Sequence, residues 1–191
     1  LGVVTGFMAL LPGGAPLSFT LVSLYLVGSG HMVAGIALGP SLLGRISPEK
    51  RPDRAIAIAK RMGIPLKIAA KVDAADARYF QEKIEPLILG QDLIEFVGEI
   101  GDEAKSGFLG EAQALLFPID WPEPFGLVMI EAMACGTPVV AYRCGSVPEV
   151  IEDGVTGFIV TDEDEAVAAV ARTPGLNRRD VRRRFDERFS A

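Results

Sequence analysis

Two cations lie close together in a loop where they are able to bind an anion. Arg45 and Lys50 belong to the segment Gly44-Arg-Ile-Ser-Pro-Glu-Lys50, between an apolar run and a helical pattern that begins near Pro52. A guanidinium, an ammonium and the free N–H groups of a helix N-terminus together can neutralise a diphosphate. The loop therefore predicts an anion site. The alternative is that both are solvated surface cations, because exposed Lys and Arg are common.

Two carboxylates, Glu123 and Glu131, flank a second loop with seven residues between them. Glu123 stands between two prolines, and Glu131 lies in a predicted helix, residues 126–134, whose other members are apolar. A helix that is apolar all round is buried, and an unpartnered carboxylate in it costs on the order of several kcal/mol. We therefore expect a partner for Glu131, and the candidates are Arg143, backbone N–H groups or ligand hydroxyls.

The backbone between these carboxylates is a further candidate for phosphate binding. The amides of Phe125, Gly126 and Leu127 follow a rigid, Pro-flanked turn and open the predicted helix. Free N–H groups at a helix N-terminus bind anions. Nearby Trp121 is expected to pack the loop, and the alternative is that it stacks on a sugar.

The composition narrows the classes of chemistry. The 191 residues contain 19 Lys plus Arg against 25 Asp plus Glu, so the net charge of −6 argues against a nucleic-acid-binding surface. Cys135 and Cys144 form no C-x-x-C pair, so they are expected to be small core or loop residues in a reduced compartment. With His31 as the only histidine, a His-rich metal site is excluded. Chemistry is expected to depend on carboxylates, Arg and Lys.

Two nucleotide-binding motifs fail on inspection. Gly28-Ser-Gly30 begins like a dinucleotide fingerprint, but Val33 stands where a glycine is needed. Gly39 and Gly44 have the spacing of a phosphate-binding loop, but Arg45 follows instead of Lys. Neither segment supports NAD binding or NTP hydrolysis.

Strand and helix patterns alternate along the chain from residue 41. Apolar runs predict strands over residues 41–46, 66–70, 93–97, 114–117, 139–142 and 157–160. Helical periodicity predicts helices over residues 52–61, 74–88, 102–113, 126–134 and 162–172. This alternation predicts an α/β fold, a Rossmann-like parallel sheet with helices on both faces. Ligands bind at the carboxyl ends of such strands, where both candidate loops lie.

Three regions are predicted. Residues 1–40 are an uncharged apolar segment, interpreted as a packing segment or a remnant. Its apolar runs are shorter than the ~20 residues that a membrane-spanning helix needs. The motif Gly28-Ser-Gly-His-Met32 within it resembles a cloning scar. Residues 41–175 form the ligand-binding domain. Residues 176–191 form an Arg-rich C-terminal helix, expected to be solvated; the alternative is a patch for an anionic membrane or another domain.

The ordered motifs resemble a known family. They are Gly44-Arg45 with Lys50, Glu123-Pro-Phe-Gly-Leu-Val-Met-Ile-Glu131-Ala-Met-Ala-Cys-Gly-Thr-Pro, Gly145-Ser-Val-Pro-Glu149-Val-Ile and Asp153-Gly-Val-Thr-Gly157-Phe. From about Leu42 to Thr161 the chain resembles the C-terminal donor-binding domain of family 4 retaining glycosyltransferases, which have the GT-B fold.

The resemblance implies a role for each matching residue. Arg45 and Lys50 would hold the donor diphosphate and stabilise the leaving nucleotide, and Glu123 would contact the transferred sugar; these three are the expected catalytic residues. Glu131 would accept hydrogen bonds from the ribose diol. The amides of Phe125, Gly126 and Leu127 would reach the sugar and phosphate, and residues 96–100 would hold the base. No metal or other cofactor is implied.

The implied reaction is transfer of a hexosyl group from a UDP or GDP sugar to a hydroxyl acceptor, with retention of configuration. GT-B enzymes also have an N-terminal acceptor domain, which forty residues cannot contain, so this chain alone is expected to be inactive. The expected location is cytoplasmic, with peripheral attachment at the inner membrane face and a lipid-linked acceptor as further options. The alternatives are a non-catalytic nucleotide-sugar-binding module and a GT-B sugar-nucleotide epimerase.

Overall fold

The computed structural model describes residues 39–190. The sequence predictions for the apolar segment, the scar-like motif and His31 therefore lie outside the described residues, apart from residues 39 and 40 of the first region.

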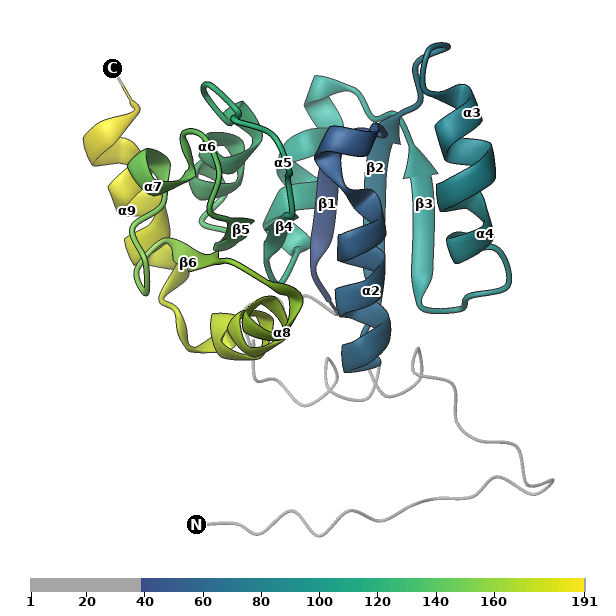
Figure 1. Cartoon of the computed structure of the whole chain (residues 1–191). Coiled ribbons are helices and arrows are strands. Elements are labelled where there is room, and N and C mark those ends of the chain that lie inside the picture. Colours follow the sequence, from purple (N-terminus) through teal and green to yellow (C-terminus); the bar gives the residue numbers. More distant parts are fainter. Residues whose placement is uncertain (1–38, 191) are drawn as a thin grey trace, which may run out of the picture. The chain divides into compact units, whose positions relative to one another are not determined.

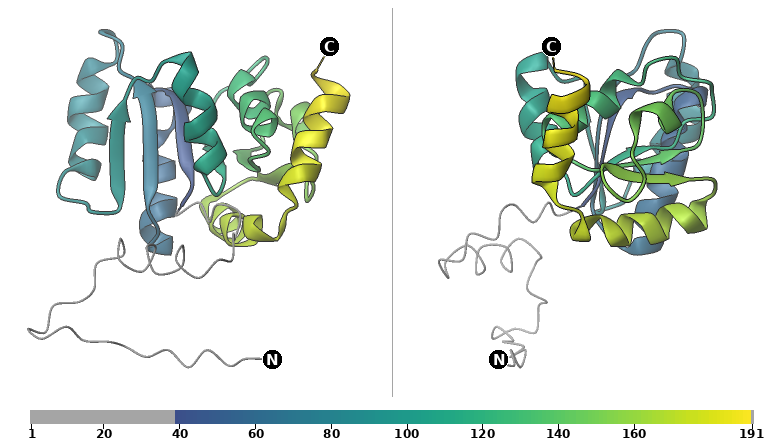
Figure 2. Two further views of the ribbon diagram at one scale, coloured as in Figure 1. Left: turned by 180° about the vertical axis from the view of Figure 1, so that it is seen from behind. Right: turned by 90° about the vertical axis from the view of Figure 1, so that its left-hand side faces the viewer.

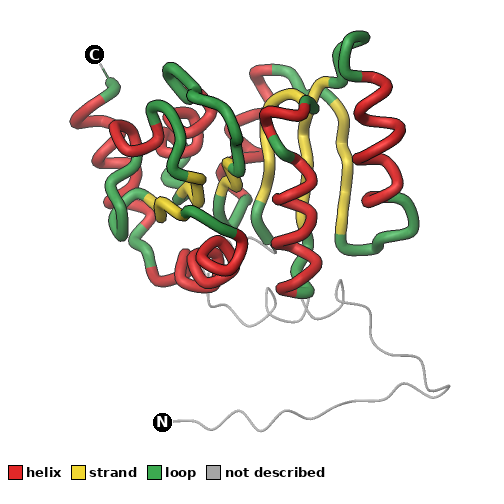
Figure 3. Tube along the Cα trace, viewed as in Figure 1, coloured by secondary structure: helices red, strands yellow, loops and turns green. Residues whose placement is uncertain are grey.

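Six parallel strands form one sheet in the described part of the chain. They are β1 (Ser41–Arg45), β2 (Leu66–Lys71), β3 (Ile94–Gly98), β4 (Leu115–Phe117), β5 (Val139–Tyr142) and β6 (Gly157–Val160). All six lie where apolar runs predicted strands, and Figure 3 shows that the three at one side are short. The order β3-β2-β1-β4-β5-β6 confirms the predicted Rossmann-like parallel sheet.

Helices connect successive strands, and two further helices follow the last strand. They are α2 (Pro52–Met62), α3 (Ala77–Tyr79), α4 (Glu85–Ile88), α5 (Asp102–Glu111), α6 (Leu127–Ala134), α7 (Val147–Val150), α8 (Glu163–Arg172) and α9 (Arg178–Arg188). Short 3-10 turns lie at Pro48–Lys50 and Thr173–Gly175, and a π-helical turn lies at Phe80–Ile84.

The helix predicted over residues 74–88 is confirmed from Ala77 to Ile88, where α3, the π-helical turn and α4 follow one another without a gap, and it begins three residues later than predicted. Pro86 lies in the first turn of α4. It has no N–H to donate and its ring would clash with the carbonyl of Glu82 in a regular α-helix, which agrees with the wider π-helical turn just before it.

The helices cover both faces of the sheet (Figures 1 and 2). Alternate strand residues divide between two cores: Leu116 and Val140 pack with α2 and α8, whereas Leu115 and Val139 pack with α6 and α9. This division follows from the period of two along a strand, which points successive side chains to opposite faces. The predicted Arg-rich helix is α9, and it is not fully solvated, because Val181 is buried against the second core.

The sheet leaves an opening at its centre. From β1 the chain proceeds to β2 on one side, and the later strands continue from β4 on the other side of β1. β1 and β4 pair at one position only, where Ser41 lies opposite Leu115. Their carboxyl ends are therefore not joined by ladder hydrogen bonds, and such a switch point is where open α/β sheets bind ligands.

Candidate functional site

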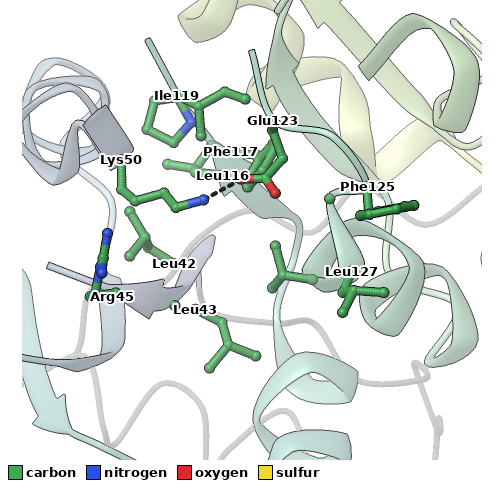
Figure 4. A pocket seen from close by; sticks show the side chains of 14 residues that line it. Leu42, Leu43, Arg45, Lys50, Leu116, Phe117, Ile119, Glu123, Phe125 and Leu127 are labelled. Atoms are coloured by element: carbon green, nitrogen blue, oxygen red, sulfur yellow. Dashed lines mark hydrogen bonds and ion pairs between the residues drawn. The ribbon is translucent and has the colours of Figure 1, made fainter. Parts of the chain in front are cut away.

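A pocket lies between the carboxyl ends of β1 and β4. It is lined by Leu42, Leu43, Gly44, Arg45, Lys50, Leu116, Phe117, Pro118, Ile119, Glu123, Phe125, Gly126, Leu127 and Val128. The two candidate loops therefore meet at one site, as the positions of both loops after strands predicted. In Figure 4, Arg45 and Lys50 lie on one side, and Phe125 and Leu127 lie on the other.

An ion pair connects the two loops across this pocket. The Nζ atom of Lys50 donates a hydrogen bond to Oε2 of Glu123 (Figure 4), and it lies 5.7 Å from the centre of the Phe117 ring. Burial alone would raise the pKa of Glu123, but the hydrogen bond and charge of Lys50 hold that pKa below its ordinary value. Glu123 is therefore ionised at neutral pH.

Trp121 supports the same carboxylate. Its Nε1 atom donates a hydrogen bond to Oε2 of Glu123 at 3.3 Å. The side chain is 43% exposed, so the expectation that it packs within the loop was wrong. Sequence reasoning missed this contact, because it depends on the path of the loop and on the rotamers of the two side chains.

Arg45 has carboxylates around it. Its Nη2 atom donates to Oε1 of Glu49 at 2.6 Å, and Asp73 and Asp76 lie 3.8 and 3.9 Å from its other nitrogens. Arg45 ends β1 and Glu49 lies in the 3-10 turn that follows, so the path of the loop between them brings the two side chains together. Sequence reasoning missed this pair, because no helical spacing indicates it.

A second set of contacts holds the cationic loop against the carboxylate loop. The N–H of Asp120 donates to the carbonyl oxygen of Glu49 at 2.8 Å. The Asp120 carboxylate accepts hydrogen bonds from Arg51 at 3.1 Å and Arg54 at 3.2 Å. Arg51 has a φ of 49°, an unfavourable angle for a residue with a side chain, and its bonds to Asp53 and Asp120 stabilise that conformation.

Two glycines determine where the carboxylate loop lies. Gly126 has a φ of 65° and precedes α6, and Gly145 has a φ of 52° beside the backbone of Glu123. A Cβ atom at Gly145 would come within 2.4 Å of the backbone N and O of Glu123. The N–H of Ser146 also donates to the Glu123 carbonyl at 2.8 Å, so the Gly145 turn holds this loop in place.

Glu131 does not line the pocket; the prediction that its helix is buried all round was wrong, whereas the expectation that its carboxylate has a partner is confirmed. Its side chain is 41% exposed, and α6 is not buried all round, because Leu127 is 69% exposed. Its partner is Lys105 of α5, at 3.2 Å from Oε1, and not Arg143. Hydrogen bonds to Asp102 and Glu131 raise the pKa of Lys105.

Both cysteines are free and partly buried, and burial raises the pKa of the Cys135 thiol. Within residues 39–190, no three His, Cys, Asp or Glu side chains gather as a metal site requires. In the same range, no helix has the length and apolar character needed to cross a membrane.

Comparison with known proteins assigns the chain to a family. The profile of the family described as "Glycosyl transferases group 1" matches residues 42–188. The chain belongs to this glycosyltransferase family. It is 36% identical over 156 residues to D-inositol 3-phosphate glycosyltransferase of Streptomyces scabiei, and 33% identical over 178 residues to the enzyme of the same name from Streptomyces griseus.

These matches cover most of the chain but a small part of each relative. The first covers 73% of the chain and 35% of the relative, and the second covers 83% and 35%. The glycosyltransferase chain therefore spans about a third of the length of these curated relatives.

Solved structures agree with the fold. AviGT4, a glycosyltransferase involved in avilamycin A biosynthesis, superposes with a TM-score of 0.66 and 30% identity, covering 82% of the chain and 47% of that protein. Anabaena Alr3699/HepE in complex with UDP and glucose superposes with a TM-score of 0.71 and 24% identity, covering 80% and 44%.

Proposed function

We propose that this glycosyltransferase domain binds a nucleoside diphosphate sugar and supplies the donor side of a retaining hexosyl transfer of the family 4 type. The observation that carries the proposal is the convergence of Arg45, Lys50 and Glu123 at the carboxyl ends of β1 and β4. Relatives of the same fold support the ligand class, because Anabaena Alr3699/HepE was solved with UDP and with UDP-glucose. The acceptor is a hydroxyl compound.

The two cations would neutralise the diphosphate. Charge develops on the diphosphate as its bond to the sugar breaks, and positioned donors stabilise that charge most where water is excluded. Lys50 is partly buried beside Phe117, and Arg45 is a planar fork suited to phosphate oxygens. This pair would supply the positive charge without a metal ion.

The carboxylates and amides would orient the rest of the donor. Glu123 would accept hydrogen bonds from hydroxyls of the sugar, since a carboxylate accepts two donors at once. The amides of Phe125, Gly126 and Leu127 open α6 beside the pocket and would donate to a phosphate. Glu131 has one oxygen bound to Lys105, and its second oxygen would accept from the ribose.

The test is calorimetric titration of the 191-residue chain with UDP and with GDP. We expect saturable binding of one of them and a loss of affinity of about tenfold or more in Arg45→Ala and in Lys50→Ala, the size of a lost charged hydrogen bond. Arg78→Ala is the matched control, because Arg78 pairs with Glu82 on the surface and lies outside the pocket. Equal weak heats in all four proteins would exclude the diphosphate assignment.

A further inference from the structure

The guanidinium of Arg45 contacts or faces a carboxylate with each of its nitrogens. Nη2 lies 2.6 Å from Glu49, Nη1 lies 3.8 Å from Asp73, and Nε lies 3.9 Å from Asp76. Asp73 is shared with Lys71 at 2.9 Å, whereas Glu49 makes its ion pair with Arg45. The strongest competitor for this cation is therefore the Glu49 carboxylate.

Glu49 is well placed to act on the pocket without lining it. It belongs to the same 3-10 turn as Lys50, and the pocket lining includes Arg45 and Lys50 but not Glu49. A hydrogen bond from its own backbone lowers the pKa of Glu49, with Arg45 adding to the effect, so the carboxylate is ionised at neutral pH. The Glu49 carboxylate is negative, like a phosphate, and it pairs with the Arg45 guanidinium to which a phosphate would bind.

We propose that Glu49 is an affinity-determining residue of the diphosphate site, because its carboxylate competes with the ligand for Arg45. This inference rests on the proposed function. A ligand must displace Glu49 to contact Arg45. Its gain in binding free energy is therefore the difference between the Arg45–phosphate contact and the Arg45–Glu49 contact that it replaces. The ligand also approaches Asp73 and Asp76, whose charges repel it. The chain thus sets its donor affinity below the level that the two cations alone would give.

The opposite role is a positioning one, in which Glu49 holds Arg45 in the orientation that phosphate requires. The two roles predict opposite signs. Removing the charge of a competitor strengthens binding, whereas removing a positioning partner weakens binding because Arg45 becomes free to turn toward solvent. Glu49→Gln keeps the shape of the side chain and the backbone carbonyl that accepts from Asp120.

The experiment compares five proteins by calorimetry at low ionic strength, with UDP and with inorganic pyrophosphate as probes. They are the wild type, Glu49→Gln, Asp76→Asn, Glu82→Gln and Arg45→Ala. Glu49→Gln is expected to raise affinity about two- to fivefold, the factor that corresponds to an exposed ion pair. Asp76→Asn, which removes a weaker contact at 3.9 Å, is expected to give a smaller gain. Asp76 makes no side-chain capping bond to α3, so this change leaves the helix start intact.

The matched control is Glu82→Gln. Glu82 accepts from Arg78 at 2.7 Å with the same four-residue spacing, outside the pocket, and its removal should leave affinity unchanged. This inference alone would be overturned if Glu49→Gln bound the probes no more tightly than the wild type while Arg45→Ala bound them more weakly. Two results would overturn the proposed function and this inference with it. One is that the wild type binds neither probe, and the other is that wild type and Arg45→Ala bind both probes with equal affinity.

Discussion

At the scale of single residues, Lys50 has two tasks in the proposed site. It pairs with the Glu123 carboxylate, and it would also contact the donor diphosphate. An ammonium carries three N–H donors, so it is able to bridge a carboxylate and a phosphate. Sugar recognition and phosphate recognition would therefore be coupled through one side chain.

This coupling predicts how Glu123→Gln changes ligand preference. The amide no longer pairs with Lys50 as an ion, so UDP affinity is expected to stay the same or rise. The gain in affinity that a sugar adds to UDP is expected to fall about three- to tenfold, since hydrogen bonds from sugar hydroxyls to a charged acceptor are lost. Calorimetric titration of both proteins with UDP and UDP-glucose measures the ratio, and a drop in UDP affinity with an unchanged ratio would contradict this role.

The Lys50–Glu123 pair also predicts a pH dependence of stability. The pKa of Glu123 is lowered in the folded chain from its ordinary value of 4.5, so its contribution is present above that value and is lost as pH falls through the folded pKa. The stability gap between wild type and Glu123→Gln should therefore be larger at pH 7 than at pH 3. Urea unfolding at the two pH values tests this, and a gap that does not shrink in acid would contradict it.

At the scale of elements, the turn at Gly145 positions the carboxylate loop. Gly145→Ala combines a left-handed φ with a backbone clash at 2.4 Å and is expected to cost roughly 2–4 kcal/mol of stability. Gly154→Ala is the matched control, because Gly154 has a φ of 77° with open space around it, and strain alone costs about 1 kcal/mol. Urea unfolding should separate the two variants, and equal losses would show that the contact with Glu123 is unimportant.

The elements themselves were largely predictable because their signals are local. Each strand is a short apolar run, and buried parallel strands need such runs on both faces. The four-residue α7 is too short to show a periodic pattern, and the π-helical turn within residues 77–88 depends on how one proline is accommodated. The prediction that α6 is buried all round was wrong, because one side of that helix faces a pocket and composition does not show this.

The site was predictable where it depended on which loops follow which strands. Parallel strands bring their carboxyl ends to one edge, so Arg45, Lys50 and Glu123 were expected to meet. Contacts that depend on side-chain rotamers were missed, such as those of Glu49 with Arg45 and Trp121 with Glu123.

At the scale of the described part of the chain, α9 stabilises the helical layer that α5 and α6 form on one face of the sheet. Arg178 donates to the carbonyl oxygens of Ala112 at 2.7 Å and Gly110 at 2.8 Å, at the end of α5, and to the Thr137 hydroxyl at 2.6 Å. Figure 2 shows α9 beside the helices of that layer. An arginine at a helix C-terminus satisfies carbonyls that would otherwise lack donors.

Arg178→Ala is therefore expected to destabilise the domain by about 2 kcal/mol, because it leaves partly buried carbonyl oxygens unpaired. The adjacent Arg179→Ala is the control, since Arg179 is exposed. Urea unfolding measures both free energies, and similar small losses in the two variants would contradict a fastening role for Arg178.

The central claim is that the pocket between β1 and β4 binds the diphosphate of a nucleotide sugar. A crystal structure of the chain with UDP tests it most directly. We predict that the diphosphate lies against Arg45, Lys50 and the first amides of α6, with Glu49 displaced from Arg45. UDP bound elsewhere, such as against the arginines of α9, with the Arg45–Glu49 and Lys50–Glu123 pairs intact, would contradict the claim.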